Sequence, residues 1–311
     1  MTGTKLTPQD YRETAYAGIL SFLRFPFSRD LAGADMAVLG VPYDLGTTNR
    51  SGARSGPRAI REQSSLVGEF EWGVWPWDYH LNDRHTVVDY GDVCDFTAYP
   101  ERMTAELERM ASEIISQDTA LLSLGGDHFI SLALLRAHVK KYGPLALIHF
   151  DAHTDTWVSE DYNHGTMFYH AIQEGLIDVE HSIQLGIRTP NPDTFGLQIV
   201  DAIALDNMTN KEVAATICNR VQDRKAYVSF DIDFLDPAFA PGTGTPVPGG
   251  ASVMQGREIL RGLKELNVVG GDLVEVAPSY DPIGSVTALA GATLACDILY
   301  LISEALTRGR G

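Results

Sequence analysis

The sequence has little of three things: cysteine, positive charge and uninterrupted apolar residues. Its cysteines, Cys94, Cys218 and Cys296, are odd in number and form no CxxC pair, which argues against a disulfide framework or a thiolate zinc site. Its 24 basic residues face 41 acidic ones, a net charge of −17, so nucleic acid and anionic membranes are unsuitable partners. No run approaches the ~18 apolar residues of a membrane span, and no signal peptide is visible. These absences predict a cytoplasmic protein with reduced thiols.

The 311 residues otherwise have an ordinary globular composition, with 44% hydrophobic and 21% charged residues. Short apolar runs alternate with helical patterns, and several runs are apolar at successive positions, as in strands buried on both faces. No Pro-, Gly- or Ser-rich linker interrupts the alternation. The pattern predicts one domain over residues 1–311, of α/β class, with a mostly parallel sheet covered by helices on both sides.

The individual elements can be placed by residue range. Strands are expected at 37–41, 85–90, 120–124, 145–150, 182–187, 226–230 and 268–276, and helices at 103–114, 129–142, 211–221, 252–266 and 285–306. Residues 70–79 are dense in aromatics. We expect a packed loop there, with a subunit contact or a lid as the alternative, because exposed aromatics tend to mark interfaces.

Metal-capable side chains follow four of the expected strands. The carboxyl ends of parallel strands meet at one edge of a sheet, so these side chains should gather there: Asp127, His128, Asp151, His153, Asp155, Asp231, Asp233 and Glu275. A single Asp after a strand usually caps the next helix, and a network of caps and salt bridges is the alternative interpretation. Eight such residues at four strand ends are hard to explain that way.

The donor types and their spacing indicate metal ions. In 151–155 and in 231–233 acidic and histidine side chains recur every second residue, which directs them to one spot if the strand continues. Carboxylate and imidazole without thiolate suit hard or borderline ions such as Mn²⁺. So many carboxylates need compensating positive charge, and two ions supply it better than one.

Three further residues have separate expectations. Asp127 is either an outer partner that orients a ligand or a structural hydrogen bonder. His164 lies in a loop shortly after Asp155 and is a candidate general acid or base. His149, inside an expected strand, is predicted to be a core histidine with satisfied nitrogens.

These segments resemble the ureohydrolases, the family of arginase and agmatinase. The motifs that carry the resemblance are Gly125–His128 (GGDH), Asp151–Asp155 (DAHTD), Ser229–Asp236 (SFDIDFLD), Pro237–Gly250 (PAFAPGTGTPVPGG) and Glu275–Pro282 (EVAPSYDP). Their order and spacing match the family from Gly40 to Tyr300, and DAHTD followed by SFDID at this distance is specific. The residues within these motifs are most similar to those of the bacterial agmatinases.

The resemblance implies an arginase-like three-layer α/β/α fold and two Mn²⁺ per chain. By position in the motifs, one ion would be held by His128, Asp151, Asp155 and Asp231, and the other by Asp151, His153, Asp231 and Asp233. Glu275 would receive the guanidinium of the substrate, and His164 or Asp155 would protonate the leaving amine. The resemblance also implies a homo-oligomer, a trimer or a hexamer, and hydrolysis of agmatine to urea and putrescine, the chemistry of polyamine biosynthesis.

The substrate is less constrained than the reaction. Glu160 and Asp161 precede His164, and an acidic mouth would favour the ammonium tail of agmatine over a carboxylate tail, unless both acids face solvent. Arginine, guanidinobutyrate and guanidinopropionate are the alternatives within the family. A dinuclear phosphoesterase is a poorer match, because no histidine follows His181 and its anionic substrate would meet Glu275. A non-catalytic metal-binding relative is the remaining alternative.

Overall fold

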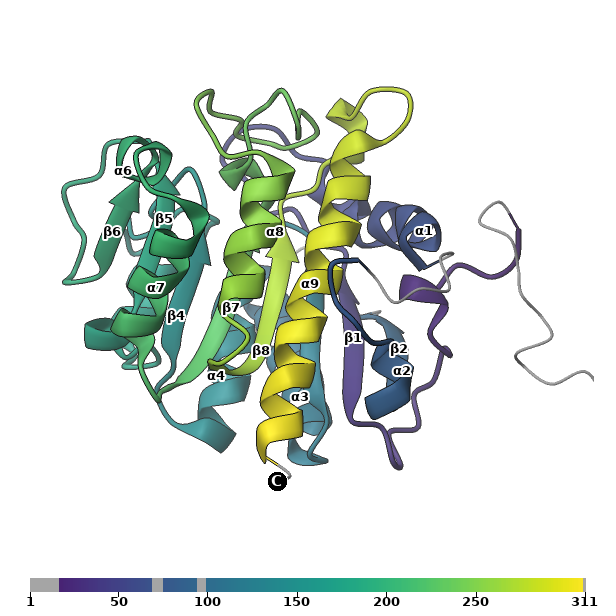
Figure 1. The fold of residues 1–311 in the computed structure, drawn as a ribbon. Helices are drawn as coiled ribbons and strands as arrows, with labels where there is room; N and C mark the ends of the chain where they lie inside the picture. The colour runs from purple at the N-terminus through teal and green to yellow at the C-terminus, as the bar shows by residue number, and fades with distance from the viewer. Residues whose placement is uncertain (1–16, 69–74, 94–98, 310–311) are drawn as a thin grey trace, which may run out of the picture.

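The structure is a computed structural model that describes residues 17–68, 75–93 and 99–309. Within these residues, eight strands form one sheet in the order β2-β1-β3-β8-β7-β4-β5-β6, and every neighbouring pair is parallel. The strands are Met36–Val41 (β1), Val87–Asp92 (β2), Ala120–Gly125 (β3), Ala146–Phe150 (β4), Ile183–Ile187 (β5), Gln198–Asp201 (β6), Lys225–Asp231 (β7) and Asn267–Val274 (β8) (Figure 1).

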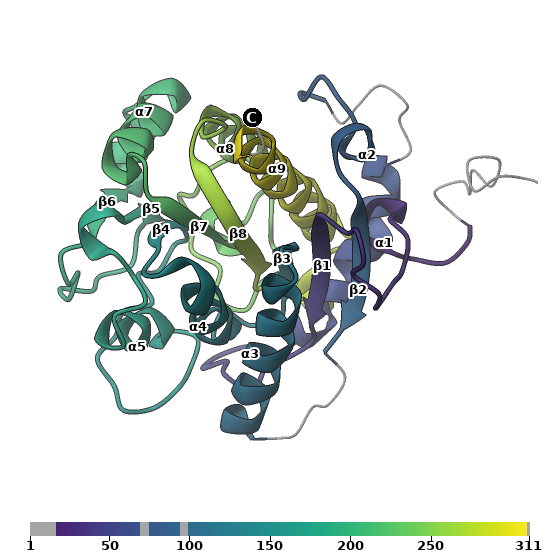
Figure 2. The ribbon, with the colours of Figure 1, turned by 90° about the horizontal axis from the view of Figure 1, so that it is seen from below.

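Helices cover both faces of this sheet (Figure 2). They span Gly56–Gly68 (α1), Leu81–Arg84 (α2), Pro100–Ser116 (α3), Ile130–Tyr142 (α4), Met167–Gln173 (α5), Ala202–Asp206 (α6), Asn210–Val221 (α7), Val253–Gly262 (α8) and Val286–Gly309 (α9). Helices α1, α7, α8 and α9 pack against one another on one face, and α3, α4 and α5 do so on the other. The predicted α/β class and three-layer arrangement are therefore confirmed.

The inner strands are apolar at successive positions because each face lies against a helical layer. In β1 every residue is buried; Met36 and Val38 join the core under α1, α8 and α9, while Ala37 and Leu39 join the core under α3 and α4. Because both faces are buried, a parallel strand is apolar at successive positions and does not alternate between apolar and polar residues.

The observed elements differ from the expected ones in a few places. The edge strand β6 was missed because only Val200 of its four residues is buried, so it has no apolar run. The helix expected at 252–266 ends at Gly262, since the chain must reverse before β8 begins at Asn267. The strand expected to reach residue 276 ends at Val274, because Glu275 has φ of +63° and leaves the extended conformation.

Helix α9 is long and mostly apolar, but Thr293, Asp297 and Ser303 interrupt it, so no uninterrupted apolar run reaches the length of a membrane span. Its 24 residues, with a mean hydropathy of 1.7 over the apolar window, are long and apolar enough to cross a bilayer. However, 83% of that window is buried inside the fold, where the helix contacts β3, β8, α1 and α8. Its apolar character is therefore explained by the core of the protein.

In the described part of the aromatic stretch Trp77 and Tyr79 are packed, as expected, whereas Trp75 is 64% exposed. Trp77 stacks on Tyr300 with ring centroids 4.9 Å apart, its indole N–H donates to Asp297 at 2.7 Å, and Tyr79 is buried. Residues 70–74 of the stretch and Cys94 lie outside the described residues. Cys296 is buried and Cys218 is partly buried, and both are free thiols.

Buried His138 on α4 makes the stability of the fold depend on pH. Its Nδ1 donates to the carbonyl of Leu134 at 2.7 Å, its Nε2 has no partner, and burial lowers the pKa to about 4. The unfolded chain binds a proton near pH 6.5, whereas the folded chain resists it down to about pH 4. Stability should therefore fall as the pH drops through this window, by up to about 3 kcal/mol.

We expect His138→Leu to remove this contribution. In urea unfolding between pH 7 and pH 4.5, the free energy of unfolding should fall less steeply for the variant than for the parent protein. Other groups titrate equally in both proteins, so the difference between the two slopes isolates His138. Identical slopes would contradict the assignment.

Candidate metal centre

The candidate site lies at the carboxyl edge of four adjacent strands, β3, β8, β7 and β4. Each strand delivers its metal-capable residues where it ends, so residues from four separate segments of the sequence come together. His128 follows β3, Asp151 follows β4, Asp231 ends β7 and Glu275 follows β8. All four are buried, which is unusual for ionisable side chains unless they are paired or bind an ion.

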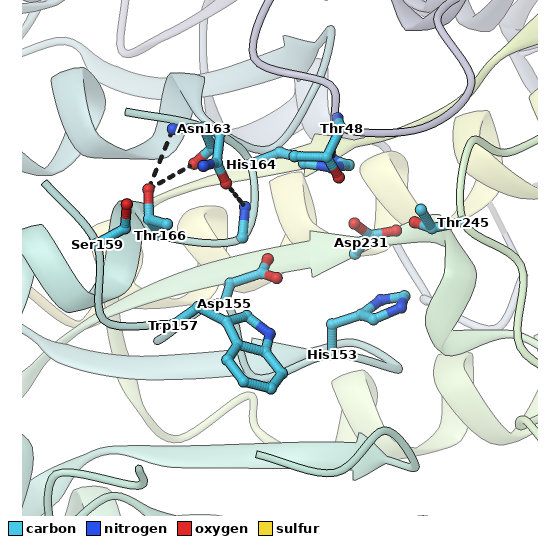
Figure 3. Close-up of a pocket in the computed structure, with 11 residues that line it drawn as sticks. Thr48, His153, Asp155, Trp157, Ser159, Asn163, His164, Thr166, Asp231 and Thr245 are labelled. Atoms are coloured by element: carbon cyan, nitrogen blue, oxygen red, sulfur yellow. Dashed lines mark hydrogen bonds between the residues drawn. The ribbon is translucent and has the colours of Figure 1, made fainter. Parts of the chain in front are cut away.

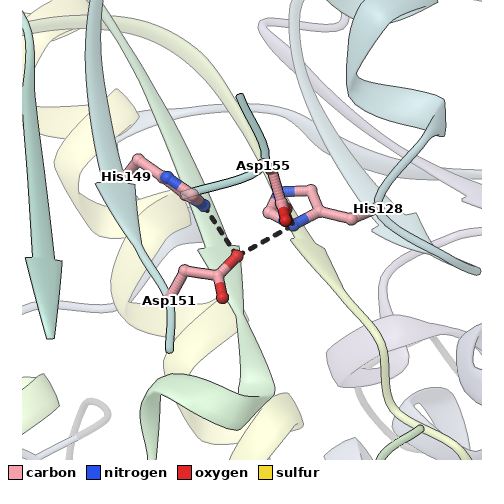
Figure 4. Close-up of side chains that lie close together, drawn as sticks. All are labelled: His128, His149, Asp151 and Asp155. Atoms are coloured by element: carbon pink, nitrogen blue, oxygen red, sulfur yellow. Dashed lines mark hydrogen bonds and ion pairs between the residues drawn. The ribbon is translucent and has the colours of Figure 1, made fainter. Parts of the chain in front are cut away.

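The first group of candidate ligands surrounds the Nδ1 atom of His128. This atom lies 3.2 Å from Asp151 Oδ2, 2.9 Å from Asp155 Oδ2 and 3.3 Å from Asp231 Oδ2. Figure 4 shows the imidazole and the carboxylates of Asp151 and Asp155 pointing toward one another. Three carboxylates around one imidazole nitrogen form the kind of pocket that a divalent cation fills.

A second group shares Asp151 with the first. The Nδ1 atom of His153 lies 3.3 Å from Asp151 Oδ1 and 3.1 Å from Asp233 Oδ2. Asp151 therefore turns one oxygen to each group, which is the arrangement of a bridging carboxylate. Asp231 faces the first group through Oδ2 and accepts the amide hydrogen of Asp233 at 2.8 Å through Oδ1.

Hydrogen bonds behind His128 fix which of its nitrogens can face a metal. The Ser229 hydroxyl donates to Asp272 Oδ1 at 2.7 Å, so its oxygen accepts from His128 Nε2, also at 2.7 Å. Nε2 then carries the hydrogen of the neutral ring, and Nδ1 presents a lone pair to the carboxylates. Buried Nδ1 has no hydrogen-bond partner of its own, which fits a nitrogen that binds a cation.

The charge balance of the site also fits a cation. Burial and then the neighbouring Asp151 raise the pKa of Asp155 and of Asp233. Burial, Asp233 and Asp151 raise the pKa of Asp231 well above its ordinary value. Without compensating positive charge these carboxylates would resist ionisation, and divalent ions would remove that penalty.

Two residues of the site have strained backbone conformations. Asp155 has φ of +53° and Glu275 has φ of +63°, in the left-handed region that non-glycine residues rarely occupy. Such strain costs about 1–3 kcal/mol per residue and persists where the surrounding structure or function requires it. The strain coincides with two of the three residues expected to have catalytic roles.

Glu275 lies between His164, which lines the cavity, and the backbone of the candidate ligand His128. Glu275 Oε1 accepts the backbone N–H of His128 and the Nδ1–H of His164, both at 2.9 Å. Its other oxygen, Oε2, is buried without a partner. A buried carboxylate oxygen left free in this way can accept hydrogen bonds from a bound cation.

His164 is held in one tautomer by the loop before α1. The backbone N–H of Thr48 donates to His164 Nε2 at 3.0 Å, so this nitrogen is an acceptor and the hydrogen lies on Nδ1. Burial lowers and the Glu275 carboxylate raises the pKa of His164, with a net rise to about 9. A second proton on Nε2 would take its lone pair and break the bond to Thr48. Protonation of His164 is thus coupled to this loop.

The remaining predicted residues have supporting positions. Asp127 accepts the amide hydrogens of Gly46 and Phe129 at 2.7 and 3.1 Å, which favours the structural alternative. His149 is buried and both of its nitrogens are bonded, as expected of a core histidine, but one bond is to Asp151. Ser229 and Asp272 were not predicted at all.

A cavity of about 410 Å³ opens above the ligands (Figure 3). His153, Asp155, His164 and Asp231 reach it, and its remaining described lining is neutral: Thr48, Trp157, Ser159, Asn163, Gly165, Thr166 and Thr245. Glu160 and Asp161 are exposed and do not line it. The described residues therefore form no acidic mouth at this cavity. Glu160 and Asp161 face solvent, which was the alternative expectation.

Comparisons with known proteins agree with this geometry. A sequence model of the arginase family matches residues 34–300. An agmatinase of Chromobacterium violaceum is 48% identical over 302 residues, 96% of this chain and 92% of its own length. The crystal structure of a hypothetical agmatinase from Burkholderia thailandensis superposes with a TM-score of 0.90 at 48% identity, covering 95% of this chain and 93% of that one. Proclavaminate amidino hydrolase from Streptomyces clavuligerus superposes with a TM-score of 0.88 at 37% identity, covering 94% and 100%.

Proposed function

The chain belongs to the arginase family, and from that premise we propose that it is an amidinohydrolase that converts agmatine to urea and putrescine. The observation that carries the proposal is the buried Glu275, which accepts the backbone N–H of the candidate ligand His128 and keeps one oxygen without a partner, at the sheet edge where two groups of metal-capable residues share Asp151. A guanidinium-binding carboxylate next to a two-ion centre is what hydrolysis of a guanidino compound requires.

Two Mn²⁺ ions per chain are the proposed cofactor. His128, Asp151, Asp155 and Asp231 would hold one ion, and Asp151, His153, Asp231 and Asp233 the other. Ions held there would act as Lewis acids and would supply a water molecule that loses a proton near neutral pH. The mixture of carboxylate and imidazole, with the lone pair of His128 Nδ1 directed inward, suits Mn²⁺ better than softer ions.

Glu275 is proposed to bind and orient the guanidinium. Its Oε1 is already occupied by His128 and His164, so Oε2 is the oxygen available to the N–H groups of the substrate. A charge-assisted contact at this point would hold the central carbon of the guanidinium toward the ligand groups. The donors on Oε1 keep the carboxylate from rotating away.

The proton for the leaving amine is assigned to Asp155. In the arrangement observed here both ring nitrogens of His164 are engaged, Nδ1 with Glu275 and Nε2 with Thr48. Asp155 lines the cavity directly and can pass a proton from the attacking water to the amine through its carboxylate. His164 then acts by holding Glu275 in place.

The tail of the substrate is proposed to be an ammonium group. No lysine or arginine is among the described residues that line the cavity, so a carboxylate tail would have no charged partner there. Trp157 lines the mouth and is 46% exposed, and an indole face can bind an ammonium group by a cation–π contact. Trp157 and the absence of a basic side chain among the described lining, rather than Glu160 and Asp161, therefore favour an ammonium tail.

Urea release from four compounds tests the proposal. With Mn²⁺ present, we expect kcat/KM for agmatine to exceed that for arginine, guanidinobutyrate and guanidinopropionate by about 100-fold, because an unpaired buried carboxylate costs several kcal/mol. A preference for a carboxylate-bearing compound would overturn the substrate assignment and leave the reaction class intact. Urea release from none of the four would contradict the proposed activity.

Two further expectations accompany the proposal. The first is a homo-oligomer, which the resemblance to the family implies. Light scattering should give the mass of a trimer or a hexamer rather than the 34.0 kDa of a single chain. The cytoplasm remains the expected location, because three cysteines without a CxxC pair suit a reducing compartment.

A further inference from the structure

Behind the candidate metal ligands lies a chain of hydrogen bonds from Gln184 through His149 to Asp151. His149 on β4 and Gln184 on β5 stand directly opposite each other in the parallel pairing. Gln184 Nε2 lies 2.9 Å from His149 Nδ1, and His149 Nε2 lies 2.8 Å from Asp151 Oδ2. Both His149 and Gln184 are fully buried, so water does not compete for these bonds.

The direction of each bond in this chain can be deduced. Gln184 Nε2 also lies 2.7 Å from the carbonyl oxygen of Thr154, which can only accept, so the amide NH₂ must face both partners. His149 Nδ1 therefore accepts from Gln184, and the hydrogen of the neutral ring lies on Nε2 and is donated to Asp151. Gln184 Oε1 is left buried without a partner, although such a group costs about 1–3 kcal/mol.

The same hydrogen positions show whether His149 itself can bind a metal ion. Its ring is close enough to His128, Asp151 and Asp155 to be grouped with them as a candidate ligand (Figure 4). However, its nitrogen on the side of the site carries a hydrogen, and its other nitrogen is bonded to Gln184. Phe168 packs edge-on against the ring at 4.6 Å and holds it in this orientation. His149 is thus a donor to a ligand and not a ligand.

We propose that Gln184 and His149 are positioning residues that set the affinity of the metal centre through Asp151. Asp151 turns Oδ2 to His128 and Oδ1 to His153, so rotation of this carboxylate would disturb both ion positions together. The hydrogen bond from His149 Nε2 opposes that rotation, and Gln184 keeps the hydrogen on Nε2. This inference rests on the proposed two-ion function.

The proposal is tested by titrating Mn²⁺ into the metal-free full-length protein in a calorimeter. Gln184→Met keeps an unbranched side chain of similar length but has no amide donor, and His149→Phe keeps a ring but has no N–H. Each should weaken Mn²⁺ binding by about 10-fold to 100-fold, the range for outer partners of metal ligands. Because both residues act through one chain, the double variant should be no weaker than the more affected single variant.

A control separates this effect from ordinary packing. Ile183→Val alters the neighbouring residue of β5, which is equally buried and belongs to the apolar core under α7 and α8; it should bind Mn²⁺ like the parent. Normal Mn²⁺ affinity in folded Gln184→Met would overturn the proposal, as would additive losses in the double variant. Loss of one whole ion per chain in His149→Phe would show that His149 is a ligand. If the parent protein itself binds no Mn²⁺, the proposed function fails rather than this inference alone.

Discussion

Replacement of Asp231 by asparagine should abolish urea release while leaving the metal-free protein at least as stable as its parent. Asp231 Oδ2 lies 3.3 Å from His128 Nδ1. Burial and the negative charges of Asp233 and Asp151 disfavour the ionised form of Asp231 and raise its pKa well above the ordinary value. The amide of asparagine removes a negative charge from this crowded group but can no longer balance a divalent ion.

The expected loss of activity is large because two ions depend on this position. Metal-ion stabilisation of the reacting groups contributes several kcal/mol, so kcat/KM should fall by at least about 1,000-fold at ~1.4 kcal/mol per tenfold. Metal analysis after loading should give two Mn²⁺ for the parent and fewer for Asp231→Asn.

The stability of the variant gives an independent measurement. In the presence of a chelator, the melting temperature of Asp231→Asn should equal or exceed that of the parent, since like-charge repulsion is relieved. With Mn²⁺ the order should reverse, because ligand binding stabilises only the protein that retains the site. Asp223→Asn, at an exposed position before the start of β7, is the matched control and should change neither property. Full activity in Asp231→Asn would remove this residue from the ligand set.

Much of this site follows from the sequence because parallel strands end at one edge of the sheet. The residues after β3, β4, β7 and β8 were predicted to converge, and the structure brings them together. The fold class followed from apolar runs that two helical layers bury. These features depend on local patterns that repeat along the chain.

The residues behind the ligands were not predicted, because their partners are distant in the sequence. Ser229 meets His128, and Gln184 meets His149, across 101 and 35 residues. A signal was nevertheless present: each is a polar residue between buried apolar neighbours in a strand, Gln184 between Ile183 and Leu185 and Ser229 between Val228 and Phe230. Because buried polar groups are almost always hydrogen-bonded, such a residue indicates a specific partner, although the sequence does not say which.

The mouth of the cavity was predicted less well for a different reason. Loop side chains have no periodicity that fixes the direction in which they point, and Glu160 and Asp161 face solvent while Ser159 and Asn163 face the cavity. The loop direction is set by bonds within 159–166, such as that from Thr166 to the carbonyl of Asp161 at 2.8 Å. These bonds could not be inferred from charge alone.

Glu275→Gln is the second substitution with a large expected effect, and it should reduce turnover without removing metal. Glu275 is outside the proposed ligand set, so the parent and the variant should bind the same number of Mn²⁺ ions. The glutamine can still accept from His128 and His164 through one oxygen, but its amide NH₂ would then replace Oε2. A donor in that place repels the N–H groups of a guanidinium, and a charge-assisted contact is lost.

The size of the loss distinguishes a substrate-binding carboxylate from a structural one. Loss of one preorganised electrostatic contact costs about 2–4 kcal/mol in transition-state stabilisation, so kcat/KM for agmatine should fall by roughly 30-fold to 1,000-fold. If Glu275 only braced its own loop, the glutamine would keep the bonds from the His128 backbone and the His164 side chain and most of the activity, and the melting temperature would fall slightly instead. A folded, metal-loaded Glu275→Gln protein with near-normal kcat/KM would therefore show that the guanidinium binds elsewhere. In that event the free Oε2 atom would need another explanation, and Asp127, a buried carboxylate that accepts the backbone N–H of Gly46, would be the next candidate to substitute.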